Sequence, residues 1–134
     1  MTFDPNPISV LDRNNSTTTE LSDGAEFIGE PVDMRHYSAV SVEAYTDQDS
    51  ADLGLEIQFS QTGKTGTWDN DQKFTVSANT QFYQSLPRFG RYMRVKYTNG
   101  STAQTTFRLQ TMVDHQPTQP YPMDYLVEVC RARS

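Results

Sequence analysis

A strict alternation of apolar and polar residues over 53–59 constrains the fold of this chain more than any other feature. The apolar side chains occupy every second position, at Leu53, Leu55, Ile57 and Phe59. Successive side chains of a strand point to opposite faces, so the run predicts a strand with one buried face. A polar segment with Gly63 and Gly66, both able to take positive φ, follows it. The chain then returns at Trp68, its only tryptophan, so we predict a β-hairpin with Trp68 in the core.

Similar short alternations recur along the chain, and no stretch shows a sustained 3.6-residue period. We expect strands over residues 16–21, 25–30, 38–46, 53–59, 73–77, 81–86, 91–97 and 105–112. Asn99-Gly100 separates the last two strands and is the strongest short signal for a type I′ hairpin, because both central residues of that turn need positive φ. We expect a corner or a brief helical turn at 33–37. About eight short strands at this spacing predict an all-β fold, a single antiparallel β-sandwich of jelly-roll type.

The prolines gather at the two ends of the chain. Five of the seven lie within the first seven residues or within residues 117–122. Proline lacks a backbone donor and favours extended backbone, so both ends are predicted to be extended arms. We expect an N-terminal arm over 1–15, a β-sandwich over 16–113 and a Pro-rich C-terminal arm over 114–134. A β-prone run at 125–130 predicts a short strand in the last arm, which pairs either with its own sheet or with a neighbour's edge.

The net charge of −6 combines an acidic first half with a basic second half. Residues 1–60 hold twelve acids and two bases, whereas residues 61–134 hold five acids and nine bases. The acidic excess argues against nucleic acid as a partner. Two arrangements remain open: acidic and basic faces that meet in neighbouring subunits, or charges that interleave and cancel in one folded sheet.

Cysteine and histidine are too few for a disulfide or a structural zinc site. Cys130 is the single cysteine, and His36 and His115 are the only imidazoles. No run approaches the ~18–20 apolar residues of a membrane span. The N-terminus has neither the basic nor the apolar region of a signal peptide. We therefore expect no cofactor and no membrane partner, and synthesis in a cytoplasm.

Two loop motifs suggest ligands. Gly63-Lys64-Thr65 is similar to the end of a phosphate-binding loop, but Gln58 stands where that motif needs a glycine and a strand follows instead of a helix. We therefore expect no nucleotide site there. The acids Asp47, Asp49 and Asp52 crowd one connection. They form either a solvated turn, which we favour, or a peripheral calcium site.

Catalytic pairs are not expected. Glu43 and Glu56 fall on the polar faces of their strands, and no apolar pocket is predicted that would raise either pKa. The two histidines lack a serine or cysteine arrangement for nucleophilic catalysis. A basic and aromatic patch comprises Arg88, Phe89, Arg91, Tyr92, Arg94, Lys96 and Tyr97. Such a patch suits either base stacking in single-stranded nucleic acid or cross-strand charge pairing, and we favour charge pairing.

Three segments together resemble small β-sandwich proteins in the virions of tailed phages and related viruses. Residues 25–42 are similar to the strand, Asp-x-x-x-Tyr corner and valine strand that open those proteins, with the corner at Asp33 and Tyr37. Residues 57–68 resemble their Ser-x-Asp-Gly-x-x-Trp hairpin, although Gln61-Thr62-Gly63 replaces the acidic turn. Residues 91–101 look like their late hairpin. The resemblance spans about residues 20–112 and leaves both arms uncovered.

This resemblance implies a non-enzymatic viral structural protein. The implied role is a capsid decoration (cement) or minor capsid subunit that stabilises the virion by bridging neighbouring subunits through its arms. The implied partners are the major capsid protein or other virion proteins, with the chain a homo-oligomer or present in repeated copies. Its implied location is the virion, after synthesis in the host cytoplasm.

The arms supply the apolar side chains expected at such an interface. They are Phe3, Ile8, Val10, Tyr121, Tyr125, Val127 and Val129. The alternative is a carbohydrate-binding β-sandwich module of a tail or adsorption device. Its platform would use Trp68, Tyr45 or Tyr92, because flat aromatic faces pack on sugar rings.

Overall fold

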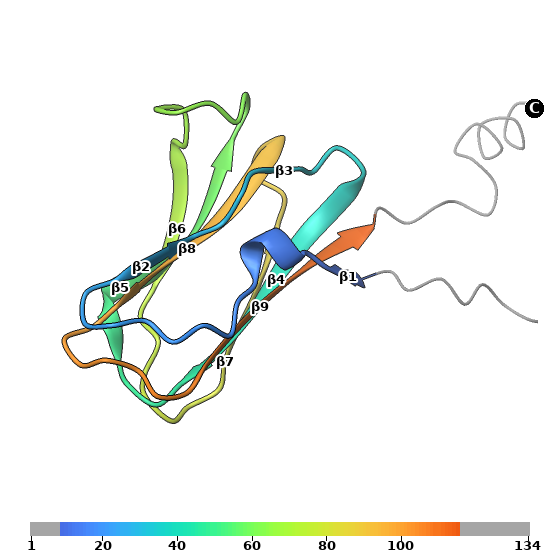
Figure 1. Cartoon of the computed structure of the whole chain (residues 1–134). Helices are drawn as coiled ribbons and strands as arrows, with labels where there is room; N and C mark the ends of the chain where they lie inside the picture. The colour runs from blue at the N-terminus through green and yellow to red at the C-terminus, as the bar shows by residue number, and fades with distance from the viewer. Residues whose placement is uncertain (1–8, 116–134) are drawn as a thin grey trace, which may run out of the picture.

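The computed structural model describes residues 9–115, which form two packed antiparallel β-sheets (Figure 1). The elements are β1 (Ser9–Leu11), the 3₁₀ turn η1 (Arg13–Asn15), β2 (Glu26–Ile28), β3 (Val32–Asp33), β4 (Tyr37–Thr46), β5 (Ser50–Ser60), β6 (Asn70–Phe74), β7 (Phe82–Pro87), β8 (Tyr92–Asn99) and β9 (Phe107–His115). The first sheet has the order β1-β9-β4-β7, and the second has the order β2-β8-β5-β6, with β3 also paired to β8. The predicted all-β sandwich is confirmed.

From β4 onward the chain passes back and forth between the two sheets. After β4 in the first sheet it forms the β5–β6 hairpin in the second, and β7, β8 and β9 then follow in alternate sheets. Each sheet therefore places a late strand between earlier ones: β9 lies between β1 and β4, and β8 lies between β2 and β5. This order is the double Greek key of a jelly roll.

The predicted hairpin at Asn99-Gly100 is wrong, because β8 and β9 lie in different sheets. Neither residue takes the positive φ that a type I′ turn needs. Asn99 is only 1% exposed, and its Nδ2 donates to the carbonyls of Leu21, Ser22 and Thr102. The buried amide network outweighs the local turn preference, and residues 100–106 cross to the other sheet instead.

The core lies between the sheets and follows the predicted alternation of β4 and β8. The buried hydrophobic side chains are Met34, Val40, Val42, Ala44, Leu55, Ile57, Phe59, Val76, Met93, Val95, Tyr97, Phe107, Leu109 and Val113. The Tyr97 and Phe107 rings pack with centroids 4.7 Å apart and join β8 to β9 across the interior. Trp68 is not among them; it lies half-buried in the loop before β6, so the predicted core tryptophan is wrong.

Strand β5 keeps its predicted buried face only from Leu55 onward. Its register with β8 shifts between Ser50 and Leu55, and Leu53 lies in this irregularity with φ of 53°. Leu53 is consequently 48% exposed. Gly54 lies against β8, where an added Cβ would come within 2.5 Å of the Thr98 carbonyl oxygen. The partner strand β6 also begins earlier than predicted, at Asn70.

The sandwich begins before the predicted boundary at residue 16. Residues 9–11 pair with β9, and Val10 packs against the core. The predicted strand at 16–21 is reduced to one bridge, between Thr17 and Leu109. Residues 16–20 contain no apolar side chain to bury, whereas β1 contributes Val10. At the other end, β9 extends to His115.

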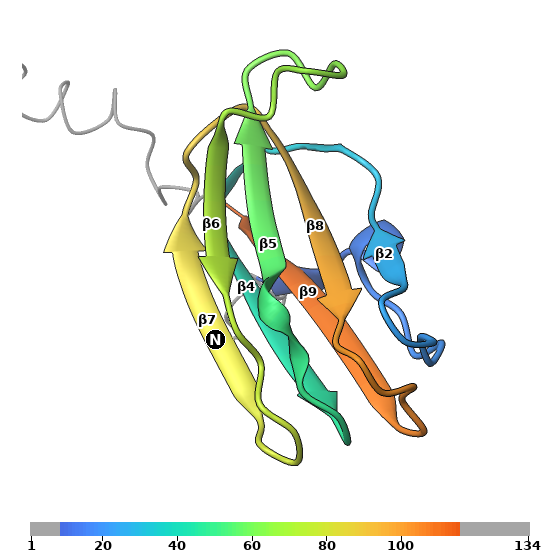
Figure 2. The ribbon, with the colours of Figure 1, turned by 90° about the vertical axis from the view of Figure 1, so that its left-hand side faces the viewer.

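The ends of the described chain lie side by side, because Ser9 pairs with Asp114. They belong to the end of the sandwich that also carries residues 34–36, 61–69 and 88–91, which we name the terminal pole (Figures 1 and 2). The opposite end, the distal pole, carries residues 17–25, 47–49, 75–81 and 100–106. Among the described residues, no helix is long and apolar enough to cross a membrane.

Candidate functional site

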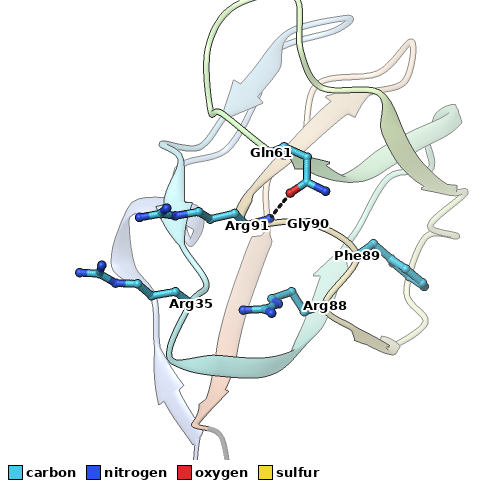
Figure 3. A pocket seen from close by; sticks show the side chains of 6 residues that line it. All are labelled: Arg35, Gln61, Arg88, Phe89, Gly90 and Arg91. Carbon is cyan, nitrogen blue, oxygen red and sulfur yellow. Dashed lines mark hydrogen bonds between the residues drawn. The ribbon is translucent and has the colours of Figure 1, made fainter.

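A surface pocket of about 370 Å³ lies on the terminal pole (Figure 3). Its lining residues are Arg35, Gln61, Arg88, Phe89, Gly90 and Arg91. They come from the turn before β4, the loop after β5 and the loop between β7 and β8. Figure 3 shows the three arginine side chains extending toward the same side of the pocket. The fold thus gathers cations from segments that are far apart in the sequence.

The loop over residues 88–91 is fixed against the end of β5. The Phe89 ring packs edge-to-face on the core ring of Phe59, with centroids 5.5 Å apart. The backbone N–H of Arg91 donates to Gln61 Oε1 at 3.3 Å. A Cβ at Gly90 would lie 3.1 Å from Phe59 Cβ and 3.2 Å from the Ser60 nitrogen. The loop therefore packs closely on the end of β5 and carries Arg88 and Arg91 there.

One acid lies among the pocket's arginines. Asp33 Oδ2 is 3.0 Å from Arg91 Nη2 and 3.7 Å from Arg35 Nε. The Arg91 side chain, followed by the Arg35 backbone N–H, lowers the pKa of Asp33, and Asp33 raises the pKa of Arg91. Arg88 Nη1 donates to the Met34 carbonyl at 2.9 Å. Three guanidinium groups against one carboxylate leave the pocket positively charged.

The chemistry of this lining is that of an anion-binding surface. A guanidinium presents a planar fork of donors that matches a carboxylate or phosphate group. The six lining residues include no serine, cysteine, histidine or carboxylate that would serve as a nucleophile or general base. The pocket is therefore suited to holding an anionic group.

The basic and aromatic patch seen in the sequence does not form one surface. Tyr97 is fully buried in the core. Arg94 lies on the outer face of the second sheet, where its Nε donates to Gln58 Oε1 at 2.7 Å. Only Arg88 and Arg91 reach the pocket, together with Phe89. A continuous stacking platform for single-stranded nucleic acid is not assembled from these residues.

The aromatic residues considered for sugar binding each carry a guanidinium over the ring. Arg94 Cζ lies 4.5 Å from the centroid of Trp68, Arg91 Cζ lies 5.3 Å from that of Tyr92, and Arg108 Cζ lies 4.9 Å from that of Tyr45. These cation–π contacts occupy ring faces that a sugar would need. The rings also lie on three separate elements, and Tyr45 belongs to the other sheet. The geometry does not favour the carbohydrate-binding alternative.

The three acids considered for calcium are each hydrogen-bonded to a neighbouring loop, Asp47 to residues 100–106 and Asp49 and Asp52 to residues 75–81. Asp47 accepts hydrogen bonds from Thr105 and Thr106, which lower its pKa to about 2. Asp49 accepts from the Ala78 N–H, and Asp52 accepts from the hydroxyl of Thr75. Within residues 9–115, no three His, Cys, Asp or Glu side chains gather in a way that could hold a metal ion. The acids are loop-fixing groups.

The two glutamates considered as a catalytic pair lie on different sheets. Glu43 belongs to β4 and accepts from Gln81 Nε2 at 3.0 Å, whereas Glu56 belongs to β5. The pKa of Glu56 is nevertheless shifted, although not by an apolar pocket of the kind considered. Partial burial, followed by its contact with Asp71, raises the pKa of Glu56. Because the glutamates lie on separate sheets, no glycosidase pair is assembled.

The histidines have structural surroundings. His115 ends β9 and packs on Tyr37, with ring centroids 5.0 Å apart, while His36 is exposed in the turn before β4. Of the predicted interface residues, Val10 belongs to the sandwich. The others, Phe3, Ile8, Tyr121, Tyr125, Val127 and Val129, lie outside the described residues.

Residues 8–114 match the family model described as the N-terminal domain of the uncharacterised protein YqxG. The chain belongs to this family. The match covers the whole sandwich from β1 to β9 and replaces the looser resemblance to virion proteins with a definite family, whose description gives no activity. No curated protein matches the chain.

Solved structures with a similar fold include the PBSX exported protein XepA, with a TM-score of 0.72 and 19% identity over 90% of this chain and 42% of that chain. The chain thus spans less than half the length of XepA. A structure of Bacillus endospore appendages, described as disulfide-linked pili, has a TM-score of 0.47 and 15% identity over 87% of this chain and 96% of that one. A structure of infectious bursal disease virus has a TM-score of 0.41 and 10% identity over 91% and 37%. XepA shares the fold, and the other two are too distant to bear on function.

Proposed function

We propose that this chain is a non-enzymatic structural protein of a virus particle, a capsid decoration (cement) or minor capsid subunit. Its partners are the major capsid protein or other virion proteins, and it acts in repeated copies. The jelly-roll sandwich is the rigid body of the subunit, and residues 1–8 and 116–134 are the arms by which it bridges neighbours.

One observation carries the proposal: both chain ends leave the sandwich from the terminal pole. Ser9 pairs with Asp114 in the ladder between β1 and β9, and Ser9 Oγ donates to Asp114 Oδ1 at 2.5 Å. The arms therefore start a few ångströms apart. Fully extended, the 19 residues of 116–134 would reach at most about 65 Å. Two arms that start from the same pole suit a subunit whose arms bind neighbouring capsid subunits while its sandwich lies on the outside of the particle.

The described residues support a structural role in a second way. The acids considered as metal ligands from the sequence instead hold loops in place. Asp47, for example, accepts a hydrogen bond from the Thr105 hydroxyl. The pocket on the terminal pole holds cations without a nucleophile or base. The stabilisation would come from the arms. Each buried apolar arm side chain contributes about 25 cal/mol per Å² of apolar area, and repeated copies add avidity.

Deleting residues 116–134 tests the arm mechanism. The deletion leaves Asp114 and His115 in place. Asp114 accepts a hydrogen bond from Ser9 and His115 packs on Tyr37, so both residues belong to the sandwich. We expect the shortened protein to fold and stay soluble but to lose co-sedimentation with particles of the virus that encodes it. Removing only residues 130–134 is the matched control, because it keeps the apolar side chains between Tyr121 and Val129. This variant should still bind particles. Full binding by the longer deletion would overturn the proposed arm mechanism.

A further inference from the structure

The two poles of the sandwich carry opposite charge. The distal loops, 17–25, 47–49, 75–81 and 100–106, contain four acids and no lysine or arginine. The terminal segments, 34–36, 61–69 and 88–91, contain four lysine or arginine residues and one acid, and the adjoining Asp33 and Asp114 add two further acids. The sequence left open whether the charges of the two halves cancel locally. In the fold some of them interleave, since Glu56 lies between Lys73 and Lys96 and Asp33 pairs with Arg91, while the loops of the two poles differ in charge.

The most prominent acids of the distal pole lie on one turn. Asp23 is exposed at the apex of residues 22–25, where Ala25 N donates to the Ser22 carbonyl at 3.1 Å and Gly24 has φ of 69°. Glu20 and Glu26 are exposed on either side of it. This turn, which we name the acidic turn, projects beside β2 (Figure 2).

The acidic turn is held rigidly by the body of the sandwich. Gly24 N donates to the Gly100 carbonyl at 2.8 Å, and the buried Asn99 amide donates to the carbonyls of Leu21 and Ser22. A group held in this way loses little conformational entropy when it binds. The turn is therefore a preorganised carboxylate ligand, unlike Asp47, whose carboxylate is already used by Thr105 and Thr106.

We propose that the arginine pocket on the terminal pole binds the acidic turn of a second copy of this chain. Copies then join pole to pole in one direction. Such a contact uses two different surfaces, so it leaves a free pocket at one end and a free turn at the other, and it can repeat into rows or closed rings. The proposal goes beyond the virion role and needs neither arm.

Charge and geometry together favour a second copy as the occupant. The pocket gathers Arg35, Arg88 and Arg91, and Asp33 neutralises only part of their charge. The acidic turn supplies three exposed carboxylates, whose oxygens fit guanidinium forks. A small polar contact of this kind is individually weak, and salt screens it because its charges are exposed.

The first test is the mass of the full chain in solution by sedimentation equilibrium, at up to about 1 mM protein and at about 50 and 500 mM salt. We expect concentration-dependent association at low salt that is lost at high salt. Arg35→Glu should weaken the association constant at least about tenfold. Its side chain is 63% exposed, so the substitution leaves the core intact. Arg108→Glu, which makes the same charge change beside Tyr45 on the first sheet, should leave association unchanged.

A charge swap makes the test specific. Asp23→Arg alone should weaken association as Arg35→Glu does, because two cations then face each other. The double variant Arg35→Glu/Asp23→Arg should restore it at the parent net charge of −6. The proposal is overturned by a monomer at all concentrations, by equal loss in Arg108→Glu, or by no recovery in the double variant. Arg35-dependent binding of inorganic phosphate without self-association would also overturn it and assign the pocket to a small anion.

The pole-to-pole contact and the arm mechanism can be tested independently of each other. The variant lacking residues 116–134 keeps both poles, so we expect it to self-associate like the full chain even if it no longer binds particles. Loss of self-association in that variant would contradict a pole-to-pole contact and leave the arm mechanism standing.

Discussion

One buried residue, Asn15, is hydrogen-bonded to both sheets. Its Oδ1 accepts from the Val95 N–H of β8 at 2.7 Å, and its backbone carbonyl accepts from Thr111 Oγ1 of β9 at 2.7 Å. Its Nδ2 also donates to the Glu30 carbonyl at 2.9 Å. Gly29 leaves room for it, because a Cβ there would overlap Asn15 Oδ1. Asn15 thus ties the N-terminal segment to both sheets by hydrogen bonds, in addition to the strand pairing of β1 with β9.

Replacing Asn15 by alanine should lower the free energy of unfolding by about 2–4 kcal/mol, since it leaves the buried Val95 N–H without an acceptor and removes the bond to Glu30. Urea unfolding measures the change. Asn14→Ala is the control, because Asn14 is exposed, and it should shift stability by less than about 0.5 kcal/mol. Similar losses in the two variants would contradict the role assigned to Asn15.

Sequence patterns at the residue scale indicate which side chains are apolar, but not where a polar side chain is needed inside. Val40 and Val95 were predicted correctly because alternation alone places them. Asn15 and Asn99 looked like loop and turn residues, and both are buried donors or acceptors for distant backbone. Trp68 was expected in the core on hydrophobicity alone, yet it pairs with Arg94 outside it. The hydrogen-bond and cation–π partners of these three residues lie far away in the sequence, so a local pattern does not reveal them.

At the scale of elements, long alternating strands were predictable, and the three-residue edge strand β2 lies within its predicted range 25–30, but β1 and β3 were not predicted. β4 and β8 match their predictions to within about two residues, because each alternates over its whole length. β1 has three residues and β3 has two, too few to give a period. The pairing of β8 and β9 was mispredicted because a turn signal describes only the local chain and does not determine which sheet the next strand joins.

The outer face of the second sheet is a ladder of charged and polar pairs across three strands. Glu56 of β5 lies opposite Lys73 of β6 and Lys96 of β8. In the next outward-facing row, Gln58 lies between Asp71 and Arg94. Gln58 Nε2 donates to both Glu56 and Asp71, at 3.3 and 3.1 Å, so the two acids share one amide.

This ladder makes stability depend on pH through Glu56. Its pKa is raised in the folded state above 4.5, by partial burial and then by Asp71, so the folded state holds the proton more tightly. The resulting stabilisation is full below pH 4.5 and is lost as pH rises through the folded pKa.

Glu56→Gln should therefore be more stable than the parent at pH 7, by up to about 1 kcal/mol, since screening limits the effect of partly exposed charges. The difference should shrink below pH 4.5. Urea unfolding at a series of pH values measures it. Glu43→Gln, on β4 of the other sheet, controls for removing one strand acid. A Glu56→Gln variant less stable than the parent at pH 7 would contradict this account.

At the scale of the whole molecule, the fold places the surfaces proposed to bind partners at its two ends. The terminal pole holds the arginine pocket and both chain exits, while the distal pole holds the acidic turn. The pocket could not be predicted from the sequence, because it joins Arg35 and Gln61 to the loop at 88–91. Those segments meet only through the jelly-roll order of the strands. The predicted cross-strand charge pairing is found for Lys96, which lies opposite Glu56, whereas Arg88 and Arg91 belong to the loop before β8.

The most direct test of the central proposal, that this chain is a structural component of a virus particle, is its distribution in a density gradient of purified particles. We predict that the chain bands with the particles at a fixed, repeated ratio to the major capsid protein, as quantitative mass spectrometry of each fraction measures. A chain found wholly in the soluble fractions, with none in the particle band, would contradict the proposal.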